Sequence, residues 1–197
     1  MTESDHSHRA IMPSIDALMP VVVVPSPHPA VESIEAILSQ TQNRFQRRSG
    51  PGGQHRNKTS SGVFLLHEPT GVSVEATERR SQADNRIVAA TRLRYRLAIQ
   101  VRTQSTMTSA TATDPVEQKF RDSYQGTRLK LNDANADKPA VLALLLNDLH
   151  ATGGQPSLVA KHWSVSTSSI LHLVKSQQDA FGWINSVRLH HGRKLLK

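Results

Sequence analysis

The apolar residues that follow Ser81 recur three or four positions apart. Arg94 falls close to this stripe, which is made of Ile87, Ala90, Leu93, Leu97 and Val101. Such spacing predicts a long helix running to about Arg102, with the stripe as its buried face. Ser81 with Asp84 three residues on matches a helix start, in which the serine oxygen accepts a main-chain hydrogen bond.

Two short apolar runs lie before this helix. Residues 63–67 and 72–76 read as strands, and Glu68-Pro69-Thr70-Gly71 joins them. Proline and glycine stand where a tight turn needs them, so these runs predict a β-hairpin. Further upstream, helical spacing predicts a helix over residues 31–42 from the apolar positions Val31, Ile34, Ile37 and Leu38.

The last third of the chain is rich in leucine and reads as four helices. They cover residues 139–150, 156–163, 166–178 and 179–191. Short helices separated by tight turns predict a small bundle of the helix-turn-helix type, with Trp163 and Trp183 in its core. The helix that begins at Ser166 is either a groove-reading element or part of a bundle that packs on RNA or protein without reading sequence.

The remaining stretches divide the chain. Prolines within residues 1–30 predict a disordered tail, because proline interrupts helices and central strands; these are Pro13, Pro20, Pro25, Pro27 and Pro29. Residues 103–137 begin with a Thr, Ser and Ala-rich run and are expected to be a linker. We therefore expect an α+β protein. A small sheet packed on a long helix occupies residues 31–102, and an all-α domain occupies residues 138–197.

The composition limits what these domains can do. The 197 residues contain 24 Lys and Arg against 16 Asp and Glu, a formal charge of +8. This excess favours an acidic partner such as nucleic acid. No cysteine is present, which excludes disulfides, thiolate catalysis and cysteine-ligated zinc.

Nothing in the sequence indicates a membrane segment. The longest apolar run, Val21 to Val24, is far shorter than the ~20 residues that cross a bilayer. The N-terminus lacks the basic start and apolar core of a signal peptide. We therefore expect a cytoplasmic protein, a monomer, without membrane contacts.

The segment from Asn43 to Lys58 differs from its surroundings. It has no acidic residue, and its turn-prone centre Ser49-Gly50-Pro51-Gly52-Gly53 is flanked by the cations Arg44, Arg47, Arg48, Arg56 and Lys58. Glycine reaches main-chain conformations that other residues avoid, and it lets another molecule approach closely. Gln54 then offers a main-chain N–H and a neutral carboxamide.

The run from Ser49 to Thr59 resembles the signature of bacterial-type class I peptide chain release factors. The resemblance continues, in the family's order, through His67, Pro69-Thr70-Gly71, Arg80-Ser81-Gln82 and Asn85, and it covers roughly residues 43–102. In that family a small sheet packs on a long helix, and the Gly-Gly-Gln loop is exposed. The resemblance implies that the protein hydrolyses the peptidyl-tRNA ester on the ribosome.

The resemblance also assigns roles to residues. It implies that Gly52 and Gly53 set the shape of the loop and that Gln54 acts at the ester. It further implies that a dedicated methyltransferase modifies the Gln54 side chain. Contacts to large-subunit ribosomal RNA and peptidyl-tRNA are expected from Arg47, Arg48, His55, Arg56, Asn57, Lys58, Arg79 and Arg80.

The chemistry fits these residue types. Ester hydrolysis needs a water to attack the carbonyl and a donor for the oxyanion or the departing oxygen. Because the ribosome already aligns the ester, the protein needs no catalytic triad of its own. No spacing typical of a metal site, such as His-Glu-x-x-His, is present, and we expect neither a metal nor a cofactor.

Two features depart from the family. Arg56 stands where the motif usually has a small apolar residue such as Val. The chain is also too short for the family's stop-codon-reading domain. We therefore expect it to resemble the small codon-independent members, which release peptides from stalled ribosomes.

Two other functions stay open at this point. One is a non-catalytic ribosome- or RNA-binding protein on the same scaffold. The other is a helix-turn-helix nucleic-acid-binding regulator built on the last four helices. A second tripeptide, Gly153-Gly154-Gln155, lacks the Arg and Asn-Lys flanks and precedes Pro156. We interpret it as a turn between helices.

Overall fold

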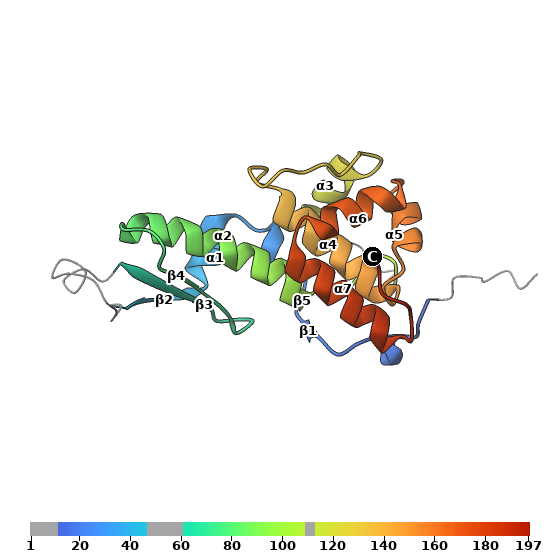
Figure 1. The fold of residues 1–197 in the computed structure, drawn as a ribbon, viewed down its shortest axis with the longest axis horizontal. Coiled ribbons are helices and arrows are strands. Elements are labelled where there is room, and N and C mark those ends of the chain that lie inside the picture. The colour runs from blue at the N-terminus through green and yellow to red at the C-terminus, as the bar shows by residue number, and fades with distance from the viewer. Residues whose placement is uncertain (1–11, 47–60, 109–112) are drawn as a thin grey trace, which may run out of the picture.

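The structure is a computed structural model that describes residues 12–46, 61–108 and 113–197. Strands β2 (Thr41–Gln46), β3 (Gly62–His67) and β4 (Val72–Ala76) form an antiparallel sheet in that order. Helix α2 (Gln82–Gln100) packs against this sheet and runs on towards a group of helices. Figure 1 shows the sheet at one end of the molecule and the helical group at the other, with α2 spanning both.

The predicted hairpin and long helix are confirmed. Buried residues of β3 and β4 alternate along each strand and face the apolar side of α2. Gly71 closes the turn between the strands with a φ of 70°, a conformation that favours glycine. Ser81 caps α2, because its Oγ accepts a hydrogen bond from the Asp84 amide at 3.3 Å.

The prediction that Ile87 belongs to the buried stripe is wrong. Ile87 is 67% exposed, whereas Ala89, Leu93 and Leu97 are fully buried. A helix turns about 100° per residue, so Ile87 lies about 120° around the axis from Leu93. Two successive steps of three, from Ile87 to Ala90 and from Ala90 to Leu93, therefore drift away from the buried face.

The helix predicted over residues 31–42 is shorter than expected. Helix α1 spans Ile34–Ser39, and the chain then enters β2, which pairs with β3 along its whole length. Gln42, Asn43 and Arg44 are exposed on this strand. An edge strand with polar side chains shows no apolar alternation, which explains why the sequence pattern did not reveal it.

The predicted disordered tail is wrong for residues 12–30. A 3-10 helix, η1 (Ile15–Ala17), precedes strand β1 (Val22–Val23), which pairs in parallel with β5 (Val101–Arg102). A second 3-10 helix, η2 (Pro29–Val31), is buried. Pro29 begins it, at a position where no main-chain N–H is needed. The prolines therefore shape this segment without preventing it from packing.

His28 anchors the segment through its ring. Its Nε2 lies 2.9 Å from the Val101 carbonyl oxygen, and its Nδ1 accepts the Ala30 amide at 3.0 Å. These two contacts require a neutral imidazole, with the proton on Nε2. Burial, followed by the nearby charge of Arg102, lowers the pKa of His28 from 6.5 to about 3.

The segment from 103 to 137 is not a plain linker. It contains helix α3 (Pro115–Tyr124), whose first turn is capped by the Asp114 carboxylate. The buried residues of α3 are Glu117 and Arg121. Phe120 and Tyr124 are partly buried against the helical core beside them, but the two buried positions are charged, so the hydrophobic pattern did not predict this helix.

The four predicted C-terminal helices are confirmed as α4 (Lys138–Ala151), α5 (Pro156–His162), α6 (Thr167–Lys175) and α7 (Gln178–His190). Helix α4 is buried along its whole length, and it packs against α2, α3, α5, α6 and α7. Trp163 lies in this core and is 2% exposed, whereas Trp183 is only partly buried against it. Ala30, Ala98 and Ala143 form a small buried cluster, where small side chains let α2 approach α4.

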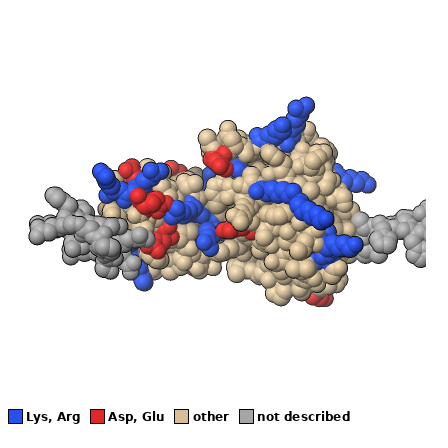
Figure 2. Space-filling view, in the orientation of Figure 1, with Lys and Arg blue, Asp and Glu red and all other residues tan. Residues whose placement is uncertain are grey.

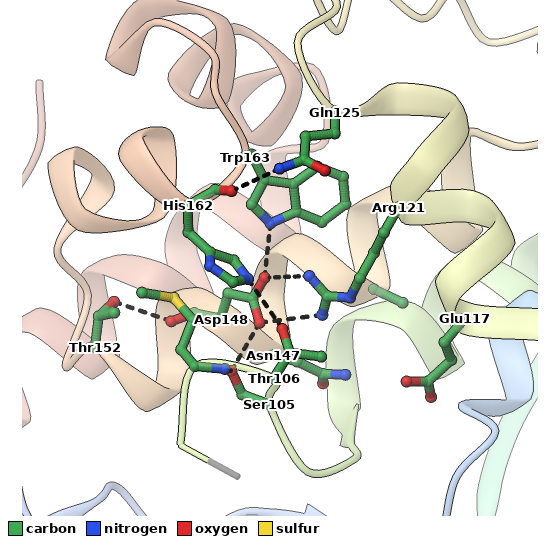
Figure 3. A network of polar contacts seen from close by, with 12 residues as sticks. Ser105, Thr106, Glu117, Arg121, Gln125, Asn147, Asp148, Thr152, His162 and Trp163 are labelled. Atoms are coloured by element: carbon green, nitrogen blue, oxygen red, sulfur yellow. Dashed lines mark hydrogen bonds and ion pairs between the residues drawn. The ribbon is translucent and has the colours of Figure 1, made fainter. Parts of the chain in front are cut away.

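A buried carboxylate joins α3, α4 and α5. Asp148 is fully buried and accepts two hydrogen bonds from the Arg121 guanidinium, at 2.7 and 3.1 Å. It also accepts the Ser105 hydroxyl at 2.7 Å and the Trp163 indole N–H at 2.6 Å. Figure 3 shows these groups converging on the carboxylate from the surrounding elements. The network satisfies the buried charge and fixes the segment after β5 on the helical core.

We predict that Asp148→Asn destabilises the protein by about 3–5 kcal/mol, because it removes the ion-pair partner of the buried Arg121 guanidinium. Urea unfolding at neutral pH measures the change. Glu78→Gln is the matched control. Its ion pair with Arg92 is partly exposed on both sides (41% and 47%), and water screens exposed ion pairs, so the cost should be much smaller than for Asp148→Asn. Equal costs for the two variants would contradict the role given to Asp148.

We predict a pH-dependent contribution from His28. Its pKa is depressed in the folded state, so below pH ~6.5 the unfolded chain binds a proton that the folded chain does not. The free energy of unfolding should therefore decrease as the pH is lowered below about 6.5, by up to about 1.4 kcal/mol per pH unit from this residue. His28→Gln removes that slope, so the unfolding free energies of wild type and variant should converge as the pH falls from 7 to 4. Urea unfolding at several pH values measures both, and a constant difference across this range would show that His28 carries no such linkage.

Candidate functional site

The predicted catalytic loop joins two strands whose ends are paired. Gln46, the last residue of β2, pairs with Gly62, the first residue of β3. Residues 47–60 connect them and lie outside the described part of the chain. This segment holds the predicted catalytic residues Gly52, Gly53 and Gln54, and most of the predicted RNA contacts: Arg47, Arg48, His55, Arg56, Asn57 and Lys58. The structure therefore describes the frame that carries the loop.

Asn85 binds the main chain where the loop returns to the sheet. This residue is fully buried, and its Nδ2 donates to the Ser61 carbonyl at 2.7 Å and to the Arg79 carbonyl at 2.9 Å. Its Oδ1 accepts the Arg79 amide at 2.9 Å. Both amide hydrogens and the oxygen of the carboxamide are used. One side chain of α2 thus holds two main-chain segments.

Sequence reasoning noted Asn85 as part of a motif and missed this role. Asn85 precedes Ala89, Leu93 and Leu97 at intervals of four, on the buried face of α2. A polar residue at a buried helical position must find hydrogen-bond partners. That conflict between residue type and position is the signal that points to Asn85.

The turn before α2 presents two of the predicted RNA contacts. Arg79 and Arg80 are exposed, and neither forms an ion pair within the described ranges. Arg92 has a different role, because it pairs with Glu78 and donates to the Glu75 carbonyl at 2.6 Å. The Glu78 ion pair and the Asn85 hydrogen bonds fix this turn on α2, so the two free arginines project from a supported main chain.

His67 and Thr70 are part of the hairpin itself. The His67 Nδ1 lies 2.8 Å from the Thr70 hydroxyl, and His67 is 1% exposed. Burial lowers the pKa of His67 below its ordinary value. These motif residues therefore shape the turn between β3 and β4, and His67 is a structural residue in this fold.

The second Gly-Gly-Gln tripeptide is a turn, as predicted. Gly153 and Gly154 have φ values of 60° and 73°, and they join α4 to α5. Gln155 is buried, and its Nε2 donates to the Thr152 carbonyl at 2.8 Å. The Arg188 side chain contacts Gly154 so closely that no Cβ could fit there. This tripeptide is enclosed and cannot present its glutamine to a ligand.

The C-terminal segment folds back on α7. The Leu196 amide donates to the Asn185 Oδ1 at 2.8 Å, and the Arg188 Nε donates to the Lys194 carbonyl at 2.7 Å. Burial and then the charges of His190 and Arg193 lower the pKa of His191. This arrangement gathers positive charge at the end of the helical domain. On the face shown in Figure 2, basic side chains predominate over the helical end, whereas both signs mix near the sheet.

Helices α5 and α6 are separated by four residues, 163–166. Ser166 caps α6 by accepting the Ser169 amide at 3.1 Å. Thr167, Ser168 and His172 are exposed, while Ile170, Leu173 and Val174 are buried. This exposed face agrees with the expected helix-turn-helix type of arrangement.

Two further points concern metal binding and membrane crossing. Within these ranges, no group of three or more His, Asp or Glu side chains is placed to hold a metal ion. None of the helices in the same ranges is long and apolar enough to cross a membrane.

Comparison with known proteins places the chain in a family. Residues 31–135 match the RF-1 domain. The chain is 50% identical over 68 residues to peptide chain release factor 2 of Acidovorax sp. (strain JS42), covering 34% of this chain and 18% of that protein. It is 41% identical over 85 residues to the mitochondrial peptide chain release factor 1 of Homo sapiens, covering 42% of this chain and 18% of that protein.

The chain therefore belongs to the class I peptide chain release factor family, as its motifs predicted. It also matches peptide chain release factor 1 of Malacoplasma penetrans, with 41% identity over 71 residues, 35% of this chain and 20% of that protein. The chain spans about a fifth of the length of these relatives. The RF-1 match runs past residue 102 and includes α3.

Proposed function

We propose that this protein hydrolyses the peptidyl-tRNA ester on the ribosome, with Gln54 acting at the ester. The observation that carries the proposal is the position of Gly52-Gly53-Gln54 within the RF-1 match, between strands whose ends pair at Gln46 and Gly62. The relatives that share this domain are peptide chain release factors. A loop carried on paired strand ends can extend from the sheet without disturbing it.

The proposed chemistry requires few groups from the protein. The Gln54 main-chain N–H stabilises the charge that develops on the oxyanion or the departing ribose oxygen. The Gln54 carboxamide orders the attacking water. Gly52 and Gly53 allow the main chain to approach the RNA closely. The cations around the loop, together with Arg79 and Arg80, neutralise phosphates of ribosomal RNA and of peptidyl-tRNA.

We further propose that release does not depend on a stop codon. The matches to the relatives cover 68 to 85 residues of this chain, and much of the rest folds as helices around α4. The helical domain, with its positive charge at the end of α7, serves as a ribosome attachment surface in this proposal. The protein then acts in the cytoplasm as a monomer on stalled ribosomes, and Gln54 is the substrate of a glutamine methyltransferase.

We predict that Gln54→Ala lowers the rate of peptide release by roughly 10²–10³-fold. The variant keeps the main-chain N–H but loses the carboxamide that orders the attacking water, and removal of one preorganised polar group costs about 2.7–4 kcal/mol of barrier. Ribosome binding should persist. Single-turnover release of a labelled peptide at saturating protein measures the effect. The control is Gln155→Ala, which changes the glutamine of the second, enclosed tripeptide. A reversed pattern would move the active site to the helical domain.

Codon independence has its own test. Release should proceed on ribosomes stalled at the end of a truncated mRNA, with no codon in the A site. Adding a stop codon to the same mRNA should not raise the single-turnover rate. The comparison uses identical peptidyl-tRNA and protein concentrations. A requirement for the stop codon would rule out the rescue role while leaving hydrolysis itself intact.

A further inference from the structure

Three parts of the candidate site meet at Asn85. The residue lies in the first turn of α2, which packs on the sheet. Its side chain binds Ser61, which directly follows the segment that contains Gln54, and it binds both main-chain polar groups of Arg79. The loop stem and the turn that carries two exposed arginines are therefore held by one carboxamide.

The strand ladder cannot replace this contact. Pairing between β2 and β3 ends at Gln46 and Gly62, so Ser61 lies just beyond the ladder. Its carbonyl has the Asn85 Nδ2 at 2.7 Å as its donor. Without Asn85, the first main-chain group of the loop stem would lose its fixed direction, even though the sheet remained paired.

The support for Asn85 is itself rigid. The side chain is fully buried, and the Ala89 and Leu93 side chains on the same face of α2 are buried against the sheet. The Glu78 pair with Arg92 holds the turn before α2 on a later part of the same helix. Because α2 holds the Asn85 carboxamide in place, this group can fix the main chain of Ser61 and Arg79 relative to α2.

We propose that Asn85 is a positioning residue for the hydrolytic reaction. It aligns the loop that carries Gln54 with the RNA-contacting turn at Arg79 and Arg80. This inference rests on the proposed function, because it assigns Asn85 to the same reaction. Asn85 acts through the main chain of Ser61 and Arg79 and does not touch the ester. A misplacement of about 1 Å at a reacting group can cost about a hundredfold in rate.

Asn85→Asp is the most informative variant. Aspartate has the same shape and keeps an acceptor for the Arg79 amide, but as a carboxylate it lacks the two N–H donors that serve the Ser61 and Arg79 carbonyls. Asn85→Ser is the second variant, because its hydroxyl can donate to one carbonyl at most. Ser81→Ala is the matched control. It removes the cap of α2 at 3.3 Å and leaves every contact to Ser61 in place.

The experiment measures three quantities on the full-length protein. Single-turnover peptide release at saturating protein gives the rate, titration with stalled ribosomes gives the affinity, and thermal unfolding gives the stability. We expect Asn85→Asp to lower the release rate at saturating protein roughly a hundredfold, with a much smaller loss of affinity, because Arg79 and Arg80 keep their charge. Ser81→Ala should lower the melting temperature and leave the rate unchanged. If Asn85→Asp does not fold, Asn85→Ser carries the same expectation, with a smaller loss.

The outcomes separate the two proposals. Wild-type release that is lost in Gln54→Ala but kept in folded Asn85 variants overturns the positioning role alone. Parallel losses of rate and stability in the Asn85 variants and in Ser81→Ala also overturn it, because they reveal a general effect of weakening α2. A wild-type protein that releases no peptide overturns the proposed function, and the inference about Asn85 with it.

Discussion

Helix α2 packs against two different partners, the sheet at one end and helix α4 at the other, and this packing connects the two halves of the molecule. Its first part is buried against the sheet through Ala89, Leu93 and Leu97, and its last part meets α4 at Ala98 and Ile99. Arg102 ends the helix by donating to the Ala98 and Ile99 carbonyls at 2.7 and 2.6 Å. A helix of 19 residues is about 28 Å long. The sheet that frames the Gln54 loop and the helical domain therefore both pack against the same helix.

This arrangement connects the fold to the proposed function. Arg94 adds a second tie, because its guanidinium binds the carbonyls of Ala30 and Ala136, both at 2.9 Å. Asp148 holds the segment after β5 on the helical core. The C-terminal segment, which carries Arg193, Lys194 and Lys197, is also held on α7 through its main chain. A ribosome contact made by the helical domain would thus restrict where the Gln54 loop can lie.

The sequence predicted what depends on regular patterns. Two short apolar runs joined by a turn with proline and glycine predicted the β3–β4 hairpin, and helical spacing predicted α2 and α4 to α7. The sequence pattern failed where apolar residues do not mark the element. The buried residues of α3 are Glu117 and Arg121, β2 is an edge strand with exposed polar side chains, and β1 pairs through two residues. The family and the position of Gly52-Gly53-Gln54 followed from a spaced motif. The Asn85 contacts could not be predicted, since they join residues 24 positions apart at Ser61 through side-chain geometry.

A structure of the protein bound to a ribosome that carries peptidyl-tRNA and an empty A site would show whether Gln54 reaches the ester. We predict that Gln54 lies within hydrogen-bonding distance of the ester at the end of the tRNA. We also predict that the Asn85 contacts to Ser61 and Arg79 persist, and that the end of α7 faces RNA. A complex in which the Gln54 loop lies away from the ester, with the helical domain alone engaged, would contradict the proposed function.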